Sequence, residues 1–203
     1  MIRDLRRTPF AALCAAVLVA ACAKGDKSAD STRIADSTAA AHTAAAPAPA
    51  AAPAAAMSDA NIFAALDEAN MADSATGSMA ATKGTSAEVK AYGREMMKDH
   101  HALRVGGQAL AKQLNITPQA APNDSSAAKD KAVADSMTAT PAGAAWDKFY
   151  IDHAVMHHQT VLTTAQDAMS ATQNAEVKAM LGKAAPIVQN HLDKAKAIQS
   201  KLQ

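Results

Sequence analysis

Three of the seven histidines in this 203-residue chain stand where they could act together: His100, His158 and His191. Each continues a series of mainly apolar residues spaced alternately by four and three positions, the pattern of a buried helix face. Counted at about 1.5 Å per residue from the ends of their predicted helices, all three lie within about two turns of one depth. A neutral imidazole carries one donor and one acceptor, and the predicted neighbours are mostly Ala, Val, Leu and Met. We therefore expect the three rings to share either a metal ion or a hydrogen-bond network with water.

Asp73 is the charged residue on the matching face of the first predicted helix, and Asn70 is the other polar candidate there. Asp73 therefore joins the three histidines as a candidate metal ligand. Three imidazoles with at most one carboxylate suit zinc or copper. A di-iron centre would need Glu-x-x-His pairs, but no glutamate stands three positions before any of these histidines. Asp99 and Asn190 directly precede two of the histidines in sequence, and we expect them to point off the buried face into water.

A second group of residues places thioethers beside imidazoles, in the runs MMKDHH (96–101) and MHH (156–158). This combination favours copper, particularly Cu(I). His153 and His157 are one turn apart, which is the spacing of a two-histidine metal pair. Their helical angle, however, is about 120–160° from the predicted buried face. We therefore expect both to be solvated surface residues, and the methionines to fill gaps in the core.

The elements that would position these residues are amphipathic helices, predicted over about 58–82, 85–114, 141–169 and 174–202. The run TSAE (85–88) has the pattern of a capping box, and Asn174 is expected to cap the last helix. Pro186 lies five residues before His191 and is expected either to kink that helix or to divide it in two.

The spacing and the links predict an all-α fold, a ferritin-like four-helix bundle made of two antiparallel helical hairpins. The short links between the first two and the last two helices make the hairpins. The connection 115–143 is long enough to cross the length of the bundle, and it includes a segment, 126–137, with weak helical character. The pentapeptide AEVKA occurs at 87–91 and again at 175–179, each time at the start of a hairpin's second helix, which fits two related hairpins.

Residues 1–21 have the pattern of a bacterial signal peptide. Three arginines precede an apolar run, 10–21, that is too short to span a bilayer as a mature helix. The run leads into VAAC (19–22), which resembles the lipobox of bacterial lipoproteins. This resemblance implies cleavage before Cys22 and lipidation of that residue. The alternative is an ordinary secretory signal that leaves Cys22 free.

Residues 22–57 are expected to form a disordered tether, because they are rich in Ala and Pro and contain Ile34 as their one branched aliphatic residue. Residues 58–203 form the predicted helical bundle. The expected location is the cell envelope, with a membrane anchor through Cys22. Ala23 after the lipidated cysteine would permit sorting to the outer membrane, where the domain faces the periplasm.

Composition excludes several other classes of protein. The 55 alanines and only 3% aromatic residues suit closely packed helices and do not suit a β-sandwich or barrel. A formal net charge of +1 gives no electrostatic support for a nucleic-acid partner. No nucleophile in a recognisable setting, glycine-rich phosphate loop or close carboxylate pair stands out, so an enzyme is not expected. The competing functions are a metal-binding envelope protein and a structural or interaction module with a polar core.

Several pieces of the sequence occur in an order that identifies a relationship: VKAY (89–92), MMKDH (96–100), WDKFYID (146–152) leading to His158, and Pro186 with His191 and Leu192. With them the stretch 59–202 resembles the DUF4142 family of bacterial secreted or lipid-anchored proteins. The resemblance implies a ferritin-like bundle, places the family's three histidines at the same three positions, and implies no established activity. This chain has Trp146 where the family usually has Phe, Asp73 near a usual Glu, and a longer central connection. The run 156–158 also resembles the DUF305 family, which is associated with metal and copper handling.

Overall fold

The computed structural model describes residues 57–202, and this part of the chain forms α-helices and no β-strand. The all-α prediction is therefore confirmed for these residues. The predicted signal peptide, Cys22 and nearly all of the predicted tether lie outside them. Within 57–202, every helix is too short or too polar to cross a membrane. In chain order the helices are α1 (Asp59–Lys83), α2 (Ala87–Gln113), α3 (Ser126–Ala139), α4 (Ala144–Ala171) and α5 (Ala175–Gln199).

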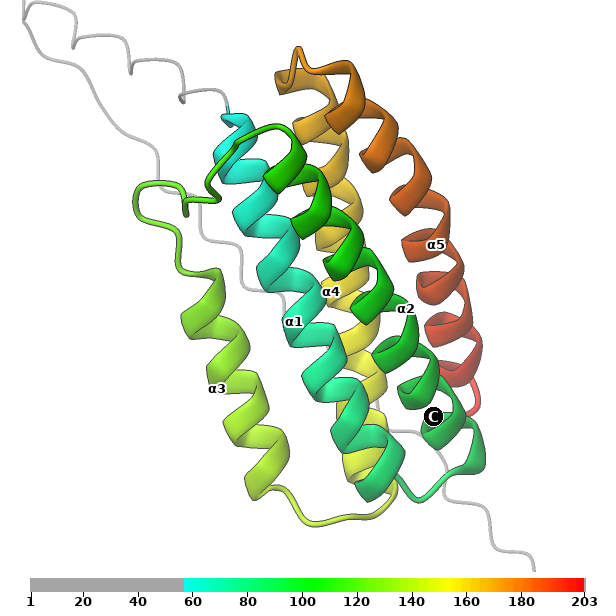
Figure 1. The fold of residues 1–203 in the computed structure, drawn as a ribbon. Coiled ribbons are helices and arrows are strands. Elements are labelled where there is room, and N and C mark those ends of the chain that lie inside the picture. The colour runs from blue at the N-terminus through cyan, green and yellow to red at the C-terminus, as the bar shows by residue number, and fades with distance from the viewer. Residues whose placement is uncertain (1–56, 203) are drawn as a thin grey trace, which may run out of the picture. The chain divides into compact units, whose positions relative to one another are not determined.

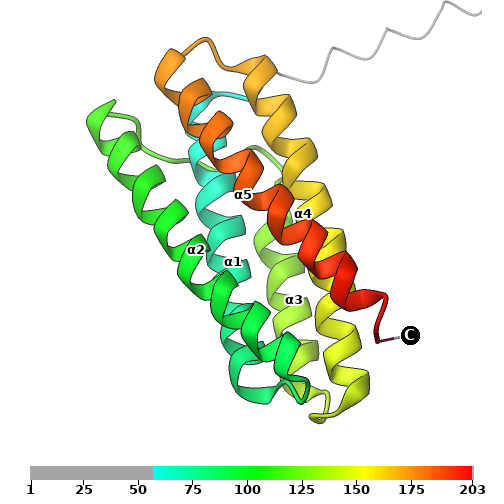
Figure 2. The ribbon, with the colours of Figure 1, turned by 90° about the vertical axis from the view of Figure 1, so that its right-hand side faces the viewer.

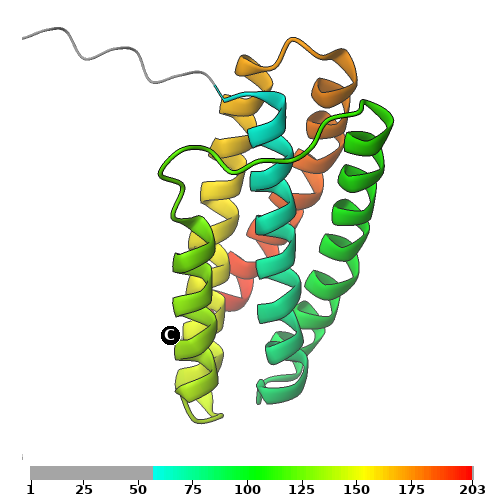
Figure 3. The same cartoon turned by 60° about the vertical axis from the view of Figure 1, so that its left-hand side comes forward.

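Four long helices make a bundle, and the shorter α3 lies against its side (Figure 1). α1 and α2 form one antiparallel hairpin, and α4 and α5 form another (Figure 2). After α2 the chain returns along the side of the bundle through α3, which runs beside α1 and α4 (Figure 3). α4 therefore starts at the same end of the bundle as α2 and runs parallel to it.

Polar caps mark the starts of three helices. Ser58 caps α1 in a capping box with Asn61. The Ser86 hydroxyl and the Asn174 side-chain carbonyl each accept the backbone N–H groups two and three positions further on, at the starts of α2 and α5. These bonds satisfy donors that the first helical turn leaves free. The predicted starts of these three helices are correct to within two residues.

Two predicted helix features are corrected by the structure. α4 starts at Ala144 and not near Pro141, because Gly143 has a φ of 151°, a backbone conformation that favours glycine and separates the proline from the helix. α5 continues through Pro186 as one helix, so a division at this proline is wrong. A Cβ added to Gly182, whose carbonyl faces the proline ring, would meet no other described atom within 4 Å, which leaves room for a local adjustment.

The long connection contains a complete helix where the sequence indicated only weak helical character. The segment 126–137 belongs to α3, which has 14 residues. Met137 of α3 is fully buried. Its carbonyl accepts hydrogen bonds from the Trp146 indole Nε1 at 2.8 Å and from the Lys83 Nζ at 2.7 Å. These contacts hold α3 against α1 and α4, so the prediction of four helices omits one that covers a face of the bundle.

A pair of glycines brings α1 and α2 into close contact. A Cβ atom added to Gly77 would lie 2.8 Å from the carbonyl oxygen of Gly93, and one added to Gly93 would lie 2.6 Å from that of Gly77. Real Cβ atoms essentially never come this near, so only glycine allows this packing. The close approach places Asp73 and Asn70, one and two turns from Gly77, against the middle of α2.

Carboxylates join the two hairpins at opposite ends of the bundle. Asp147 of α4 is buried and accepts hydrogen bonds from the Thr85 backbone and hydroxyl at 2.9 and 2.7 Å and from the Ser86 backbone at 2.7 Å. At the far end, Asp59 of α1 accepts the hydroxyl hydrogen bond of Thr172 at 2.6 Å, in the link between α4 and α5. These two ties fix the height of each hairpin relative to the other.

Candidate metal centre

The side chains of His100, His158 and His191 meet in the middle of the bundle. All three residues are at most 1% exposed. The ring centroids are 5.3 Å apart for His100 and His158, 5.0 Å for His100 and His191, and 5.5 Å for His158 and His191. One ring nitrogen from each lies within 4.8 Å of the other two. The structure therefore brings together, at one depth, the three histidines that the helical spacing selected.

Hydrogen bonds fix which nitrogen of two of these rings carries the proton. Asn70 donates through Nδ2 to the Leu66 carbonyl at 2.7 Å, so its Oδ1 faces Nδ1 of His100 at 2.9 Å. Nδ1 of His158 lies 2.9 Å from the carbonyl oxygen of Ala154. Both oxygens can only accept, so Nδ1 must be the donor in each ring. The Nε2 atom of each neutral ring then carries a lone pair.

The two Nε2 atoms face each other without a proton between them. Nε2 of His100 lies 3.3 Å from Nε2 of His158. Burial lowers the pKa of His100 from 6.5 to about 4, although the Asp73 carboxylate opposes this shift, and burial also lowers the pKa of His158. Both rings are therefore neutral at pH 7, and two lone pairs meet at hydrogen-bond distance. Two imidazole nitrogens bound to one tetrahedral metal ion at about 2.0–2.1 Å lie about 3.3 Å apart, so a metal ion fits this spacing.

Asp73 lies beside this pair of histidines. Its Oδ1 accepts a hydrogen bond from Nδ1 of His157 at 3.0 Å, while its Oδ2 makes no hydrogen bond to any described residue and lies 3.6 Å from Nε2 of His100. Burial alone raises the pKa of this carboxyl, but the His157 hydrogen bond and the nearby imidazoles of His158, His157 and His100 together lower it below its usual range. A buried carboxylate with one free oxygen therefore lies beside Nε2 of His100. Within 4.8 Å, however, Asp73 groups with His157 and His158 and not with all three core histidines.

His191 is held by a residue that we expected to point into water. Nε2 of His191 lies 3.1 Å from Oδ2 of Asp99, and the side chain of Asp99 is 29% exposed. The carboxylate accepts the Nε2 proton, which leaves the lone pair on Nδ1. This Nδ1 is buried and has no hydrogen-bond partner within residues 57–202. Histidines that bind a metal ion through one ring nitrogen commonly donate the other ring N–H to a carboxylate, as His191 does to Asp99.

His153 is buried and His157 is partly buried, so the prediction that both are solvated surface residues is wrong. His153 is 7% exposed, and the His157 side chain is 13% exposed. Helical angle placed them on an outer face, but α3 covers that face and brings Asp130 within 3.8 Å of Nε2 of His157. Burial lowers the pKa of His157, but the carboxylates of Asp73 and Asp130 more than offset it and raise that pKa above its ordinary value. His157 thus lies between two carboxylates that favour its protonated form, and it donates to Asp73.

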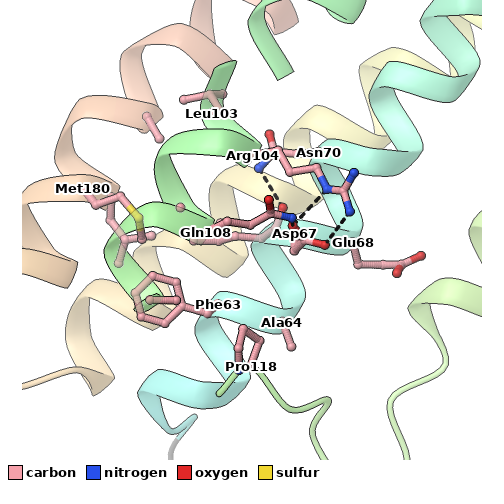
Figure 4. Close-up of a pocket in the computed structure, with 15 residues that line it drawn as sticks. Phe63, Ala64, Asp67, Glu68, Asn70, Leu103, Arg104, Gln108, Pro118 and Met180 are labelled. Atoms are coloured by element: carbon pink, nitrogen blue, oxygen red, sulfur yellow. Dashed lines mark hydrogen bonds and ion pairs between the residues drawn. The ribbon is translucent and has the colours of Figure 1, made fainter. Parts of the chain in front are cut away.

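A mainly apolar hollow adjoins the histidine cluster. It has a volume of about 280 Å³ and lies among α1, α2 and α5 (Figure 4). Asn70, which orients His100, forms part of its wall. Asp67 is already paired, since it accepts from Arg104 at 2.9 and 3.2 Å and from Gln108 at 2.7 Å. The hollow is lined mainly by apolar side chains and is not part of the histidine cluster.

A comparison with known protein families identifies the family of this chain. Residues 44–198 match the family model described as "Domain of unknown function (DUF4142)". The protein belongs to the DUF4142 family. No curated protein matches this DUF4142 chain. A solved structure named "CopM in the Cu(II)-bound form" is similar, with 13% sequence identity and a TM-score of 0.58 over 71% of this chain and 97% of that one. At this identity the likeness concerns the fold, and it agrees with an all-helical bundle.

Proposed function

We propose that this DUF4142 protein binds one copper or zinc ion through His100, His158 and His191, with Asp73 as the candidate fourth ligand. The two opposed Nε2 lone pairs, 3.3 Å apart, carry this proposal. Each Nδ1 is already committed to an acceptor, so no proton remains to join the two Nε2 atoms at neutral pH. A cation between them removes this repulsion, and the free Oδ2 of Asp73 supplies negative charge beside it.

His191, the third core histidine, also has a ring nitrogen available for the ion. With Nε2 of His191 bonded to Asp99, its unpartnered Nδ1 is the atom that would bind the ion. The proposed site then has three imidazoles and one carboxylate, a set that suits Zn(II) and Cu(II) and lacks the thiolates of a structural zinc knuckle. Divalent copper generally binds nitrogen ligands more tightly than zinc does. Because the similar structure CopM is named as Cu(II)-bound, copper is the first ion to test.

The location and the topology belong to the same proposal. We infer that the four long helices form a ferritin-like bundle in which the connection through α3 is the crossover. The signal sequence and the lipobox-like run support a lipoprotein anchored through Cys22, in the outer membrane and facing the periplasm. A flexible tether of this length would hold the domain about 30 Å from the membrane. The proposed role is to bind a metal ion in the envelope, without catalysis.

Metal analysis of the full chain tests this function. The protein is purified without a histidine tag, stripped with a chelator and dialysed against Cu(II) or, separately, Zn(II). We expect one tightly bound equivalent, and in the Cu(II) form an electron paramagnetic resonance spectrum with coupling to several nitrogens. His158→Leu should abolish this binding, whereas His42→Gln, which alters a histidine outside the bundle, should not. Circular dichroism checks that the His158→Leu variant keeps its helices.

The alternative is a structural or interaction module whose histidines form a buried polar network. It is favoured by the number of ring nitrogens that already have partners, on Asn70, Ala154 and Asp99. In that case the wild-type protein would bind no equivalent of either ion above the level of His158→Leu. The variant would then differ from the wild type in stability alone.

A further inference from the structure

A second group of metal-binding side chains lies on the surface of the α1–α2 hairpin, apart from the buried histidines. A hollow of about 270 Å³ is lined there by Met71, Ser74, Met97, His101 and Arg104. Met97 and His101 are four positions apart on one face of α2, and Met71 reaches the hollow from α1. We propose that the two thioethers and the imidazole bind one Cu(I) ion.

The packing of the hairpin explains why these residues meet. A Cβ atom added to Gly77 would lie 3.3 Å from the backbone nitrogen of Met97, so α2 at this residue lies directly on α1. Met71 stands less than two turns before Gly77, beside this contact. The side chains of Met71 and Met97 then leave the helix pair on the same side and line one hollow.

The exposure of these side chains distinguishes them from core methionines. Met71 is 43% exposed and Met97 is 38% exposed, whereas the neighbouring Met96 is 1% exposed and packs in the core. His101 is exposed as well. Single exposed apolar side chains are common on protein surfaces, but here two of them share a hollow with an imidazole. The expectation that the methionines of the two runs fill the core is therefore correct for Met96 and wrong for Met97 and Met156.

The chemistry of the set selects a soft, monovalent ion. Thioether sulfur and imidazole nitrogen are ligands that Cu(I) prefers, whereas Mg²⁺ and Ca²⁺ require the carboxylate oxygens that the lining residues lack. The Ser74 hydroxyl, which also lines the hollow, is buried and makes no hydrogen bond among the described residues. This hydroxyl is therefore free to form a hydrogen bond with a group bound in the hollow.

The positive charge of Arg104 does not oppose a cation here, because Asp67 compensates it. The guanidinium makes two hydrogen bonds to the Asp67 carboxylate, at 2.9 and 3.2 Å, and is turned toward it (Figure 4). The ion pair closes one side of the hollow without adding net charge.

This site is independent of the buried histidine centre. His100 and His101 are adjacent in sequence, but His100 points into the core and His101 lines the surface hollow. The two sites share no residue, and they differ in the ion that their ligands favour. A substitution can therefore abolish ion binding at one site while the other site still binds its ion.

Competition with bicinchoninate under anaerobic, reducing conditions measures Cu(I) binding by the full chain. We expect the double variant Met71→Leu/Met97→Leu to lose at least about tenfold in Cu(I) affinity, and His101→Gln to lose a similar amount. The control Met156→Leu/Met169→Leu removes two exposed methionines outside the hollow and should leave the affinity unchanged. His158→Leu should also keep this Cu(I) affinity, which separates the result from that of the buried centre.

Silver(I) provides a second readout that does not depend on redox conditions. In a sample with ¹³C-labelled methionine methyl groups, one equivalent of silver nitrate should shift the Met71 and Met97 signals and leave the Met156 and Met169 signals in place. Unmoved Met71 and Met97 signals would overturn the proposal. So would equal losses of Cu(I) affinity in the Met71→Leu/Met97→Leu variant and its control.

Discussion

The Asp73 carboxylate of α1 accepts a hydrogen bond from Nδ1 of His157 of α4 at 3.0 Å, and both side chains lie beneath α3. Nε2 of the same imidazole is 3.8 Å from the carboxylate of Asp130 on α3. A single imidazole ring thus links three helices, α1, α3 and α4. Because the carboxylate is buried, the pair stabilises the fold only while both partners are present.

Replacing His157 by leucine should therefore be costly. His157→Leu leaves the Asp73 carboxylate buried without its donor, and we expect the free energy of unfolding to fall by about 3 kcal/mol. Urea denaturation in the presence of a chelator measures this without a contribution from metal. Adding Asp73→Asn should restore part of the loss, since the second change removes the unpaired charge. Lys131→Ala breaks an exposed ion pair and should change stability by less than about 0.5 kcal/mol.

The glycine contact between α1 and α2 gives a prediction with a control in the same helix. Gly93→Ala puts a Cβ atom 2.6 Å from the Gly77 carbonyl oxygen, so we expect a loss of about 1–3 kcal/mol in unfolding free energy. Gly106→Ala places its Cβ where no described atom lies within 4 Å, and it should stabilise α2 by about 0.5–1 kcal/mol. Equal effects of the two substitutions would show that the close packing is not maintained in solution.

The pKa values of the buried histidines predict acid sensitivity of the metal-free protein. Burial lowers the pKa of His100 and of His153 from 6.5 to about 4. The unfolded chain therefore takes up these protons below about pH 6.5, while the folded chain does so only near pH 4. As the pH falls from about 6.5 to about 4, the free energy of unfolding therefore decreases. His157 acts in the opposite sense, because its raised pKa adds stability at low pH that is lost as the pH rises through it.

Since burial also lowers the pKa of His158, the acid-destabilising histidines outnumber His157. We expect a lower urea midpoint at pH 4.5 than at pH 7. The difference should shrink in His153→Gln, which removes one of these groups without touching the proposed ligands. A midpoint that is independent of pH over this range would contradict the prediction.

The contact between Asp99 and His191 should influence metal affinity from outside the ligand set. Asp99→Ala removes the acceptor that orients the ring, and we expect a loss of about 10- to 100-fold in Cu(II) affinity with the stoichiometry unchanged. Asp193→Ala removes a surface carboxylate of α5 that accepts only from Gln189, and it should have no effect. Competition titration with a chelator of known affinity compares the two variants.

The lipid anchor can be tested separately from the domain. Cys22→Ala should move the protein from the membrane fraction to the soluble fraction and abolish acylation. Cys14→Ala, in the segment predicted to be removed, should change neither. A Cys22→Ala protein that stays with the membrane, together with a wild-type protein that carries no acyl group, would contradict the lipoprotein prediction.

The sequence was informative where a local pattern controls the structure. The predicted cap at Asn174 is confirmed, because a side-chain oxygen two or three positions before an N–H group is a local arrangement. Ser86, and not Thr85 of the predicted capping box, caps α2. Likewise the four-and-three spacing brought His100 and His158 to one depth, because each helix must bury its apolar face.

The errors arose where a residue's environment depends on an element that is distant in sequence. α3 buries only Met137 among its own residues, so its sequence shows little periodicity, yet it covers His153 and His157. Asp99 lies off the predicted buried face of α2, but α2 has neighbours on two sides, and α5 meets it there. The position of Met71 in the sequence of its helix does not distinguish this exposed residue from a core residue.

The division of the ligands between the two hairpins has a consequence for the order of folding. Asp73 and His100 come from the first hairpin, and His158 and His191 come from the second. Contacts within each hairpin join residues near in sequence, so each hairpin can form before the two associate. Neither hairpin alone contains all four of the proposed ligands. An ion bound there would therefore stabilise the association of the two hairpins, and its removal would weaken that association.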